Sequence, residues 1–352
     1  MNDDERLNPD AVPPWLASLW PRYEGSPVIA GINDDDCAVL EWGGELLVVT
    51  TDFLNARPMA LELGVGGLGD LGRLVVAANL SDLCGSGAAP RALLIGVTMP
   101  YGSPSEDFRE LMLGVRSEAS RWAVPVVGGD TKLGAALALF GVAIGAARSR
   151  SNLFLKNGGL EGDALWTSGP LGSVSSAALG LSRGDMTPEW NEWAREVVCR
   201  PQVPVAQSRA LSDAGVGHGG IDVSDGLGAD LRRMCEASCV GATVEVSNVP
   251  VAAETRVLAD RLGVPAWAFA FASGGDFQFL VSTAPEAARA MSGLGFRRIG
   301  TLTRDPALQL CSDARVFAPM PDSGHSDARG LSFVDEIGQL LAAATSKPTE
   351  SS

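Results

Sequence analysis

The sequence contains few residues of several reactive types, and each shortage excludes a class of protein. Its 352 residues include two histidines and three lysines (Lys132, Lys156 and Lys347), and none of these lysines follows a glycine. A Walker A phosphate-binding loop requires Gly-Lys-Ser/Thr, so a nucleotide bound by this chain is not held by such a loop. The net charge of −15 and the pI near 4.6 argue against nucleic acid or an anionic membrane as a partner.

Long apolar runs and paired cysteines are missing as well. The longest apolar stretch, residues 135–147, contains two glycines and is too short to cross a bilayer. The polar, acidic N-terminus does not fit a signal peptide. The six cysteines form no Cys-X-X-Cys pair, and His218 has no nearby partners that would complete a zinc site. We therefore expect the cysteines to be free, small buried residues in a reducing cytoplasm.

What the sequence does contain is a series of short acidic clusters, most of them beside an apolar run typical of a strand or helix. Taken singly, each Asp is more simply interpreted as a turn former or a helix N-cap. Most of the clusters also carry a glycine or a hydroxyl residue, and the ends of several elements can converge on one cleft. Such a set of oxygens suits Mg²⁺ bridged by phosphate oxygens, so we predict a multi-metal nucleotide site. The clusters span residues 34–36, 50–52, 79–82, 128–131 and 222–226.

Predicted strands and helices alternate in both halves of the chain, which favours two α/β-type domains. With 46% hydrophobic residues, the chain can bury sizeable cores. A capping box at 103–106 is expected to open a helix, and Gly85-Ser86-Gly87 to end another. The expected helices cover 68–83, 103–122, 203–214 and 225–238, and a helix of small residues is expected after 169–173. The expected strands cover 46–51, 91–99, 124–127, 135–147, 163–167, 219–223, 243–246, 278–282 and 297–302. The predicted parts of the chain are an extension (1–25), an N-terminal domain (26–150), a C-terminal domain (151–335) and a tail (336–352), with a linker at 148–162.

A glycine-rich segment resembles a dinucleotide-binding motif. Residues 64–69 satisfy the Gly-X-Gly-X-X-Gly pattern of dinucleotide-binding folds. That pattern requires a strand directly before it, and the preceding residues include Pro58 and show no strand alternation. We expect a flexible loop that closes over phosphates rather than a dinucleotide site.

Together and in this order, the motifs resemble those of the thiamine-monophosphate kinases, members of the aminoimidazole-ribonucleotide-synthetase-like superfamily of ATP-using enzymes. The resemblance runs from about Gly31 to Leu302. It implies a two-domain α/β (α+β) fold whose N-terminal domains pair across a homodimer into a shared β-barrel, with the site in the cleft between the domains. The matching stretches are 35–38, 50–52, 79–83, 87–91, 128–131, 162–163, 221–227 and 273–276.

The resemblance also assigns roles to individual residues. Lys156 stands where many family members place an arginine on the nucleotide phosphates, although a solvated linker charge is an equal alternative. The residues expected to contact ATP are Gly129, Asp130, Lys156 and Ser224, and those expected to bind Mg²⁺ are Asp36, Thr50, Thr51, Asp52, Asp82, Asp130, Asp222 and Asp225. Of these, Asp52, Asp130 and Asp225 are the expected catalytic residues.

The acceptor half of the site departs from the family. The histidine usually found after the metal-binding Thr-Asp is absent from residues 55–59, and Asp276 replaces the usual glutamate. The aromatic residue expected near the C-terminus is replaced around 330–333. We predict that Arg57 and Asp276 contact the acceptor, and that Phe277 and Phe279 either line its pocket or belong to the core.

These parts predict an ATP- and Mg²⁺-dependent kinase that converts thiamine phosphate and ATP into thiamine diphosphate and ADP. One alternative is a kinase of the same fold for another small phosphorylated metabolite, and another is an ATP-dependent synthetase that activates a substrate oxygen. A nucleotide-binding regulator without catalysis is a third, although intact carboxylate clusters argue against it. Selenophosphate and hydrogenase-maturation activities fit poorly, because the earliest cysteine, Cys37, lies inside the metal motif and the C-terminus has none.

Overall fold

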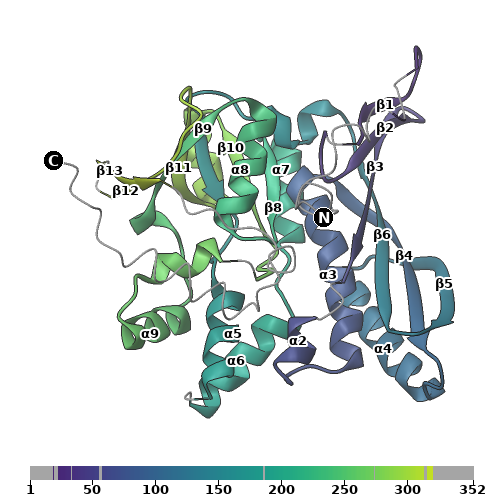
Figure 1. Ribbon diagram of the computed structural model, residues 1–352. Helices are drawn as coiled ribbons and strands as arrows, with labels where there is room; N and C mark the ends of the chain where they lie inside the picture. The colour runs from purple at the N-terminus through teal and green to yellow at the C-terminus, as the bar shows by residue number, and fades with distance from the viewer. Residues whose placement is uncertain are drawn as a thin grey trace, which may run out of the picture.

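The computed structural model describes Leu19 and residues 23–32, 34–54, 58–184, 187–272, 274–312 and 315–319. The predictions for Arg57, for the aromatic position near 330–333 and for the tail lie outside these residues. The chain forms two lobes, each built on one sheet, with helix α3 (Leu68–Ser86) between them (Figure 1).

The N-terminal lobe contains a six-stranded sheet in the order β1-β2-β3-β6-β4-β5. All neighbours are antiparallel except β4 and β5, which are parallel. Alternate residues of β3 (Leu46, Val48 and Thr50) are buried toward α3, as the period of two of a half-covered strand requires. The strands are β1 (Val28–Ala30), β2 (Ala38–Trp42), β3 (Glu45–Phe53), β4 (Ala89–Pro100), β5 (Val126–Gly134) and β6 (Ala138–Ala147).

Among the described residues, two longer helices and one short helix, α2 (Met59–Glu62), belong to this lobe. Helix α3 ends at Gly87, whose φ of 82° is the left-handed C-cap conformation that glycine adopts readily, so the predicted stop is confirmed. Helix α4 (Ser105–Arg121) lies where a helix is predicted, but the predicted capping box is wrong. Pro104 is the N-cap residue, and no side chain caps the helix.

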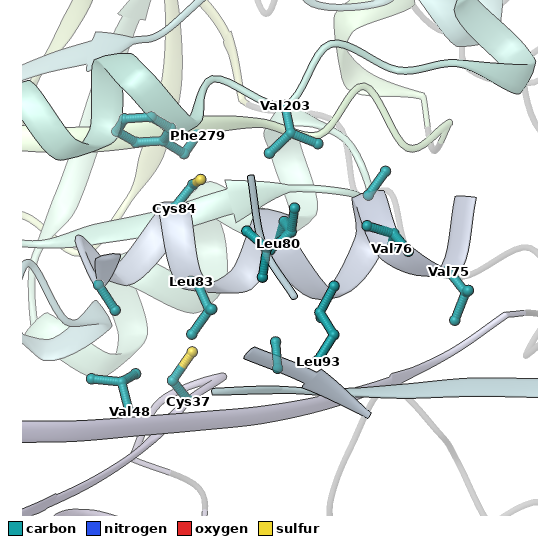
Figure 2. Packing of buried hydrophobic residues seen from close by; sticks show 14 of the residues in the cluster. Cys37, Val48, Val75, Val76, Leu80, Leu83, Cys84, Leu93, Val203 and Phe279 are labelled. Atoms are coloured by element: carbon teal, nitrogen blue, oxygen red, sulfur yellow. The ribbon is translucent and has the colours of Figure 1, made fainter. Parts of the chain in front are cut away.

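Helix α3 is buried on two sides, and this arrangement joins the lobes. Figure 2 shows Leu83 directed toward Cys37 and Val48 of the N-terminal lobe, whereas Cys84 lies on the side of Phe279, which belongs to the C-terminal lobe. A helix that is apolar on most of its circumference is typical of a core element. Residues of α3 therefore face both sheets at once.

The C-terminal lobe contains a seven-stranded sheet in the order β13-β12-β9-β11-β7-β10-β8. Helices α6, α9 and α10 of this lobe were not predicted from the sequence. The strands are β7 (Ala164–Thr167), β8 (Gly220–Val223), β9 (Gly241–Glu245), β10 (Gln278–Thr283), β11 (Arg297–Thr303), β12 (Leu308–Ser312) and β13 (Arg315–Pro319). The helices are α5 (Ser173–Arg183), α6 (Pro188–Cys199), α7 (Val205–Ala214), α8 (Leu227–Ser238), α9 (Ala253–Leu262) and α10 (Ala288–Gly293).

The segment 148–162, predicted as a linker, is packed against both lobes. It forms two 3₁₀ turns, and Leu153, Phe154 and Leu155 between them are buried. Phe154 stacks on Phe279 of β10 with ring centroids 5.8 Å apart. Such packing restricts movement of one lobe against the other at this point.

The cysteines follow the sequence prediction with one exception. Five of the six are free and buried, and Cys239 is free but exposed. Within the described ranges, no helix combines the length and the apolar character that crossing a membrane requires.

Candidate active site

Several of the predicted acidic residues meet where α3 passes β8. A Cβ atom on Gly85 would lie 2.5 Å from the backbone nitrogen of Asp222, so only glycine permits this approach of helix and strand. One turn earlier on α3, the Ser81 hydroxyl donates a hydrogen bond of 2.8 Å to Oδ2 of Asp222. This bond links the two lobes directly.

Strand β3 brings a second group of residues to the same place. The buried Thr50 hydroxyl donates to Oδ2 of Asp82, on α3, over 2.6 Å. The backbone N–H of Asp52 donates to Oδ1 of Asn79 over 3.2 Å. Gly141 on β6 leaves room for this amide, because a Cβ there would lie 2.3 Å from Nδ2 of Asn79.

We call the carboxylates that converge here the acidic cluster: Asp36, Asp52, Asp82, Asp222 and Asp225. Burial raises the pKa of Asp82 well above its usual range, and the charges of Asp222, Asp52 and Asp36 raise it further. Burial, followed by the charge of Asp36, raises the pKa of Asp222 to about 8. Neighbouring carboxylates raise one another's pKa because two like charges resist ionising together.

Lys156 supplies one of the positive charges beside the cluster. Its Nζ lies 2.8 Å from Oδ1 of Asp36, and its backbone N–H donates to Oδ2 of Asp35 over 2.7 Å. Burial, and next the charge of Asp36, raises the pKa of Asp35 to about 6. Burial lowers the pKa of the Lys156 amine, but the ion pair with Asp36 outweighs that effect and leaves the pKa above its usual value. Lys156 is therefore not a solvated linker charge.

Arg233 and Asp230, on α8, belong to the site and were missed in the sequence. Arg233 pairs with Asp225, and its Nη1 lies 2.8 Å from Oδ1 of Asp230. Oδ2 of the buried Asp230 accepts the backbone N–H groups of Ser224 and Asp225, both over 3.0 Å. An aspartate in the first turn of the helix after 222–226 was the pattern that could have indicated this cap.

Whether the cluster fits a metal ion can be judged from its charge and ligand types. Among the residues that the structure describes, no three carboxylate, histidine or cysteine side chains form a ready-made ion cage. The donors are carboxylate and hydroxyl oxygens, which hard divalent cations prefer. The raised pKa values of Asp82 and Asp222 show an excess of negative charge that a divalent cation would relieve. The residues present therefore fit Mg²⁺.

Three residues predicted to bind Mg²⁺ or ATP lie away from the acidic cluster or make other contacts. The Thr51 hydroxyl donates to the carbonyl of Gly141 over 2.8 Å, because alternate residues of β3 point to opposite faces of the sheet. Asp130 is exposed on the edge strand β5, where its Oδ2 lies 3.3 Å from Nζ of Lys132. Gly129 precedes it at a close approach to β4, since a Cβ there would lie 1.9 Å from the carbonyl oxygen of Ile95.

Asp276, predicted to contact the acceptor, binds backbone groups at the start of α5. Its Oδ2 accepts the N–H of Gly172 over 2.6 Å, and its Oδ1 that of Val174 over 3.0 Å. Burial raises the pKa of this carboxyl although the same N–H groups lower it. Phe279 is fully buried between Phe154 and Phe296, which confirms its interpretation as a core residue.

The glycine-rich segment 64–69 follows α2, not a strand, which confirms that it is no dinucleotide motif. A Cβ on Gly66 would lie 2.8 Å from Cβ of Ala60 and 3.1 Å from Sγ of Cys199. Its glycines thus serve close packing between α2, α3 and α6. Closure over phosphates stays a prediction.

Comparison with known proteins extends this picture. The chain matches the AIR synthase related protein N-terminal domain over residues 34–147 and the C-terminal domain of the same family over residues 161–310. A thiamine-monophosphate kinase of Mycobacterium tuberculosis is 32% identical over 290 residues, which cover 81% of this chain and 83% of the relative.

Solved structures agree with the family models. The thiamine-monophosphate kinase of Stenotrophomonas maltophilia K279a aligns with a TM-score of 0.68 at 27% identity and covers 82% of this chain and 92% of its own. A structure described as AaThiL complexed with AMPPCP and TMP aligns with a TM-score of 0.73 at 21% identity, over 88% of this chain and 94% of that one. At that identity the second match concerns the fold, and it confirms the predicted two-domain α/β architecture.

Three findings point to one family: the two domain models match in the expected order, a relative exceeds 30% identity along most of both chains, and solved structures share the fold. The acidic cluster between the lobes is consistent with that family. The chain belongs to the AIR synthase related proteins and, within them, to the thiamine-monophosphate kinases, a family of ATP-dependent kinases.

Proposed function

We propose that the protein transfers the γ-phosphoryl group of ATP to thiamine phosphate, giving thiamine diphosphate and ADP. The observation that carries the proposal is the partly buried acidic cluster, to which α3, β3 and β8 contribute side chains from both lobes. The resemblance implies metal ligands at these carboxylates, and the relatives are named for this reaction. We keep a cytoplasmic location as part of the proposal.

The residues that would hold Mg²⁺ are Asp36, Asp52, Asp82, Asp222 and Asp225, with the Thr50 hydroxyl beside them. Mg²⁺ supplies charge neutralisation between two phosphates that otherwise repel each other. Lys156 and Arg233 hold Asp36 and Asp225 in place and are positioned to exchange those carboxylates for phosphate oxygens. Such an exchange keeps each cation paired throughout the reaction.

The reaction asks little covalent chemistry of the protein. An oxygen of the acceptor phosphate is already anionic and bonds to the γ-phosphorus, while the bond from that phosphorus to the β-phosphate oxygen breaks and ADP leaves. No general base is needed for this step. The side chains of the cluster contribute by orienting the two phosphates in line and by excluding water from them.

A second candidate is a kinase for a different small phosphorylated acceptor. It is favoured by Asp276, because backbone N–H groups at the start of α5 engage both of its carboxylate oxygens and hold this side chain against the helix rather than toward an acceptor. Since a missing polar partner typically costs about 1–3 kcal/mol, the loss of several would weaken binding of thiamine phosphate considerably.

Steady-state kinetics with a panel of phosphorylated acceptors distinguishes the two candidates. Thiamine phosphate should show the highest kcat/KM, and mass spectrometry should detect thiamine diphosphate. A better acceptor elsewhere in the panel, with thiamine phosphate consumed at least a hundredfold less efficiently, would replace the first candidate by the second. Absence of any new diphosphate, together with intact ATP binding, would point to the regulator instead.

The homodimer with a shared β-barrel belongs to the same proposal. The sheet face turned away from α3 carries apolar side chains, among them Phe140 and the 62% exposed Phe53, whose rings stack at 4.8 Å. Among the residues that the structure describes, the edge strands β1 and β5 each have one side without a partner strand, which another chain could pair with. A second copy of the chain would cover this face and satisfy these edges.

Substitution of the exposed face tests this assembly. Phe53→Asp should convert a particle of twice the 36.5 kDa chain mass into a monomer in light scattering at micromolar concentration. Leu113→Asp, on the outer helix α4, introduces the same charge at a similarly exposed apolar site and should leave the mass unchanged. A wild-type mass equal to one chain would contradict the dimer.

A further inference from the structure

A cavity lined by positively charged side chains lies near the opposite end of strand β3 from the acidic cluster. It has a volume of about 320 Å³ and is lined by the end of β6, the start of β4 and the side of α7. On β3 its lining begins at Glu45, five residues before Thr50. At 3.3–3.4 Å per strand residue, Glu45 lies about 17 Å from Thr50 along β3.

Three arginines from three separate elements line this cavity. They are Arg91 on β4, Arg148 directly after β6, and Arg209 on α7. Within the described residues none of the three forms an ion pair or a side-chain hydrogen bond. In a chain with 42 acidic and 27 basic residues, three unpaired guanidinium groups facing one space indicate a site for an anion.

The walls between the arginines are apolar or already hydrogen-bonded. Trp122 donates its indole N–H to Glu118 over 2.9 Å, and the guanidinium of Arg121 lies 4.6 Å from its ring centroid. Asn152 and Ser212 exchange hydrogen bonds of 2.7 and 2.8 Å across the boundary between the segment 148–162 and α7. These contacts hold the walls in place before a ligand arrives, which lowers the entropy cost of binding.

The charge balance limits the kind of anion. Glu45 and Asp213 also line the cavity, so its formal excess is a single positive charge. That excess suits one phosphate group better than a polyphosphate, and the two carboxylates can accept hydrogen bonds from hydroxyl groups on the same ligand. Guanidinium groups bind phosphate oxygens through paired N–H donors, and the volume lies within the range of small-molecule pockets.

We propose that this cavity, here named the arginine cavity, is a second ligand site that binds a small hydroxyl-bearing phosphate monoester. The phosphate lies among the three guanidinium groups, and the hydroxyl groups face Glu45 and Asp213. Because Arg209 belongs to α7 whereas Arg91 and Arg148 belong to the N-terminal sheet region, the bound ligand ties these parts together. Binding therefore stabilises the folded protein and does not require Mg²⁺.

The first test uses ribose 5-phosphate and inorganic phosphate as probes. EDTA is present to remove metal ions, so that neither probe can bind to the acidic cluster through a metal ion. Calorimetric titration should detect binding of ribose 5-phosphate to the wild type. Arg148→Gln/Arg209→Gln should weaken it at least tenfold. The control Arg109→Gln/Arg304→Gln removes the same charge from residues that are 68% and 87% exposed elsewhere, and should change the affinity less than twofold.

Two further variants separate this site from its surroundings. Asp213→Asn should tighten binding of inorganic phosphate severalfold, because it removes a negative charge from the lining. Asp82→Asn should leave binding of ribose 5-phosphate unchanged, because Asp82 lies in the acidic cluster. The proposal is overturned if the wild type shows neither a heat of binding nor a rise in melting temperature with the probe at millimolar concentration, in 20-fold excess over the protein. It is also overturned if the control pair of substitutions weakens binding as much as the cavity pair, or if Asp82→Asn abolishes binding.

Discussion

The two ends of the N-terminal sheet have opposite charge and opposite degrees of burial. At one end, the buried Asp222 and the half-buried Asp82 lie among other carboxylates, and their pKa values are raised. At the other end, Arg148 and Arg209 are exposed and unpaired among the described residues. Buried like charges are costly and persist where a counter-ion neutralises them, whereas exposed arginines stay solvated and cost little while no anion is bound between them. The acidic end therefore requires a bound cation more strongly than the arginine end requires a bound anion.

This contrast predicts that the acidic end dominates activity. Asp82→Asn should lower turnover about a hundredfold or more, because it removes a metal ligand that contributes several kcal/mol to transition-state stabilisation. The measurement is kcat for ADP formation at saturating ATP and Mg²⁺. Asp260→Asn, an exposed position on α9, is the charge-matched control and should retain full turnover. Comparable activity in the two variants would remove Asp82 from the site.

The next largest effect concerns the approach of the lobes. Gly85→Ala places a methyl group 2.5 Å from the backbone nitrogen of Asp222, which cannot rotate away. Overpacking of this kind costs about 1–3 kcal/mol, and chemical denaturation should show it. Gly293→Ala, in open space on α10, should instead be neutral or stabilising by about 0.4–1 kcal/mol. Equal stability of the two variants would show that α3 and β8 can separate without loss.

Sequence patterns predicted the acidic end far better than the arginine end. The cluster could be predicted because most of its carboxylates lie in or beside a recognisable strand or helix, and most of these motifs did converge. Asp130 and Thr51 did not, since β5 pairs in parallel with β4 at the edge of the sheet and Thr51 points to the opposite face from Thr50. Strand order and facing are set by long-range pairing, which local periodicity does not report.

No local pattern in the sequence grouped the three residues of the arginine cavity, although Arg91 lies in the matching stretch 87–91. Arg91, Arg148 and Arg209 are separated by more than fifty residues each and share no motif. Their proximity depends on how α7 packs beside β4 and β6, which only the folded chain reveals. Arg233 was partly predictable. Its helix was predicted from the sequence, but its pairing with Asp225 and Asp230 became apparent only from the geometry of the helix cap.

A smaller effect should appear in the pH dependence of stability without metal. The folded-state pKa of Asp222 is about 8, above its unfolded value near 4, so its ionisation disfavours folding. The stability linked to its proton is complete below about pH 4 and is lost as the pH rises through 8. In EDTA the melting temperature should therefore fall from pH 5 to pH 8, at roughly 2–4 °C for each kcal/mol.

Asp222→Asn serves as the reference for this titration. Its melting temperature should fall less over the same interval, because the asparagine carries no proton to lose. Added Mg²⁺ should flatten the wild-type profile by neutralising the cluster, and the variant should respond less. A wild-type profile that is already flat in EDTA would mean that Asp222 ionises without cost.

The smallest expected effect isolates the hydrogen bond between the lobes. Ser81→Ala removes the 2.8 Å bond to Oδ2 of Asp222 and should cost about 1 kcal/mol of stability. Because Asp222 also loses its orientation, kcat should fall about tenfold or less, well short of the loss in Asp82→Asn. Ser86→Ala is the matched control, since this buried serine on the same helix donates within the helix to Leu83 and touches no residue of the other lobe through that bond. If both variants lose stability but only Ser81→Ala loses turnover, the bond positions Asp222 for the reaction; if turnover is the same in both, its contribution is to folding alone.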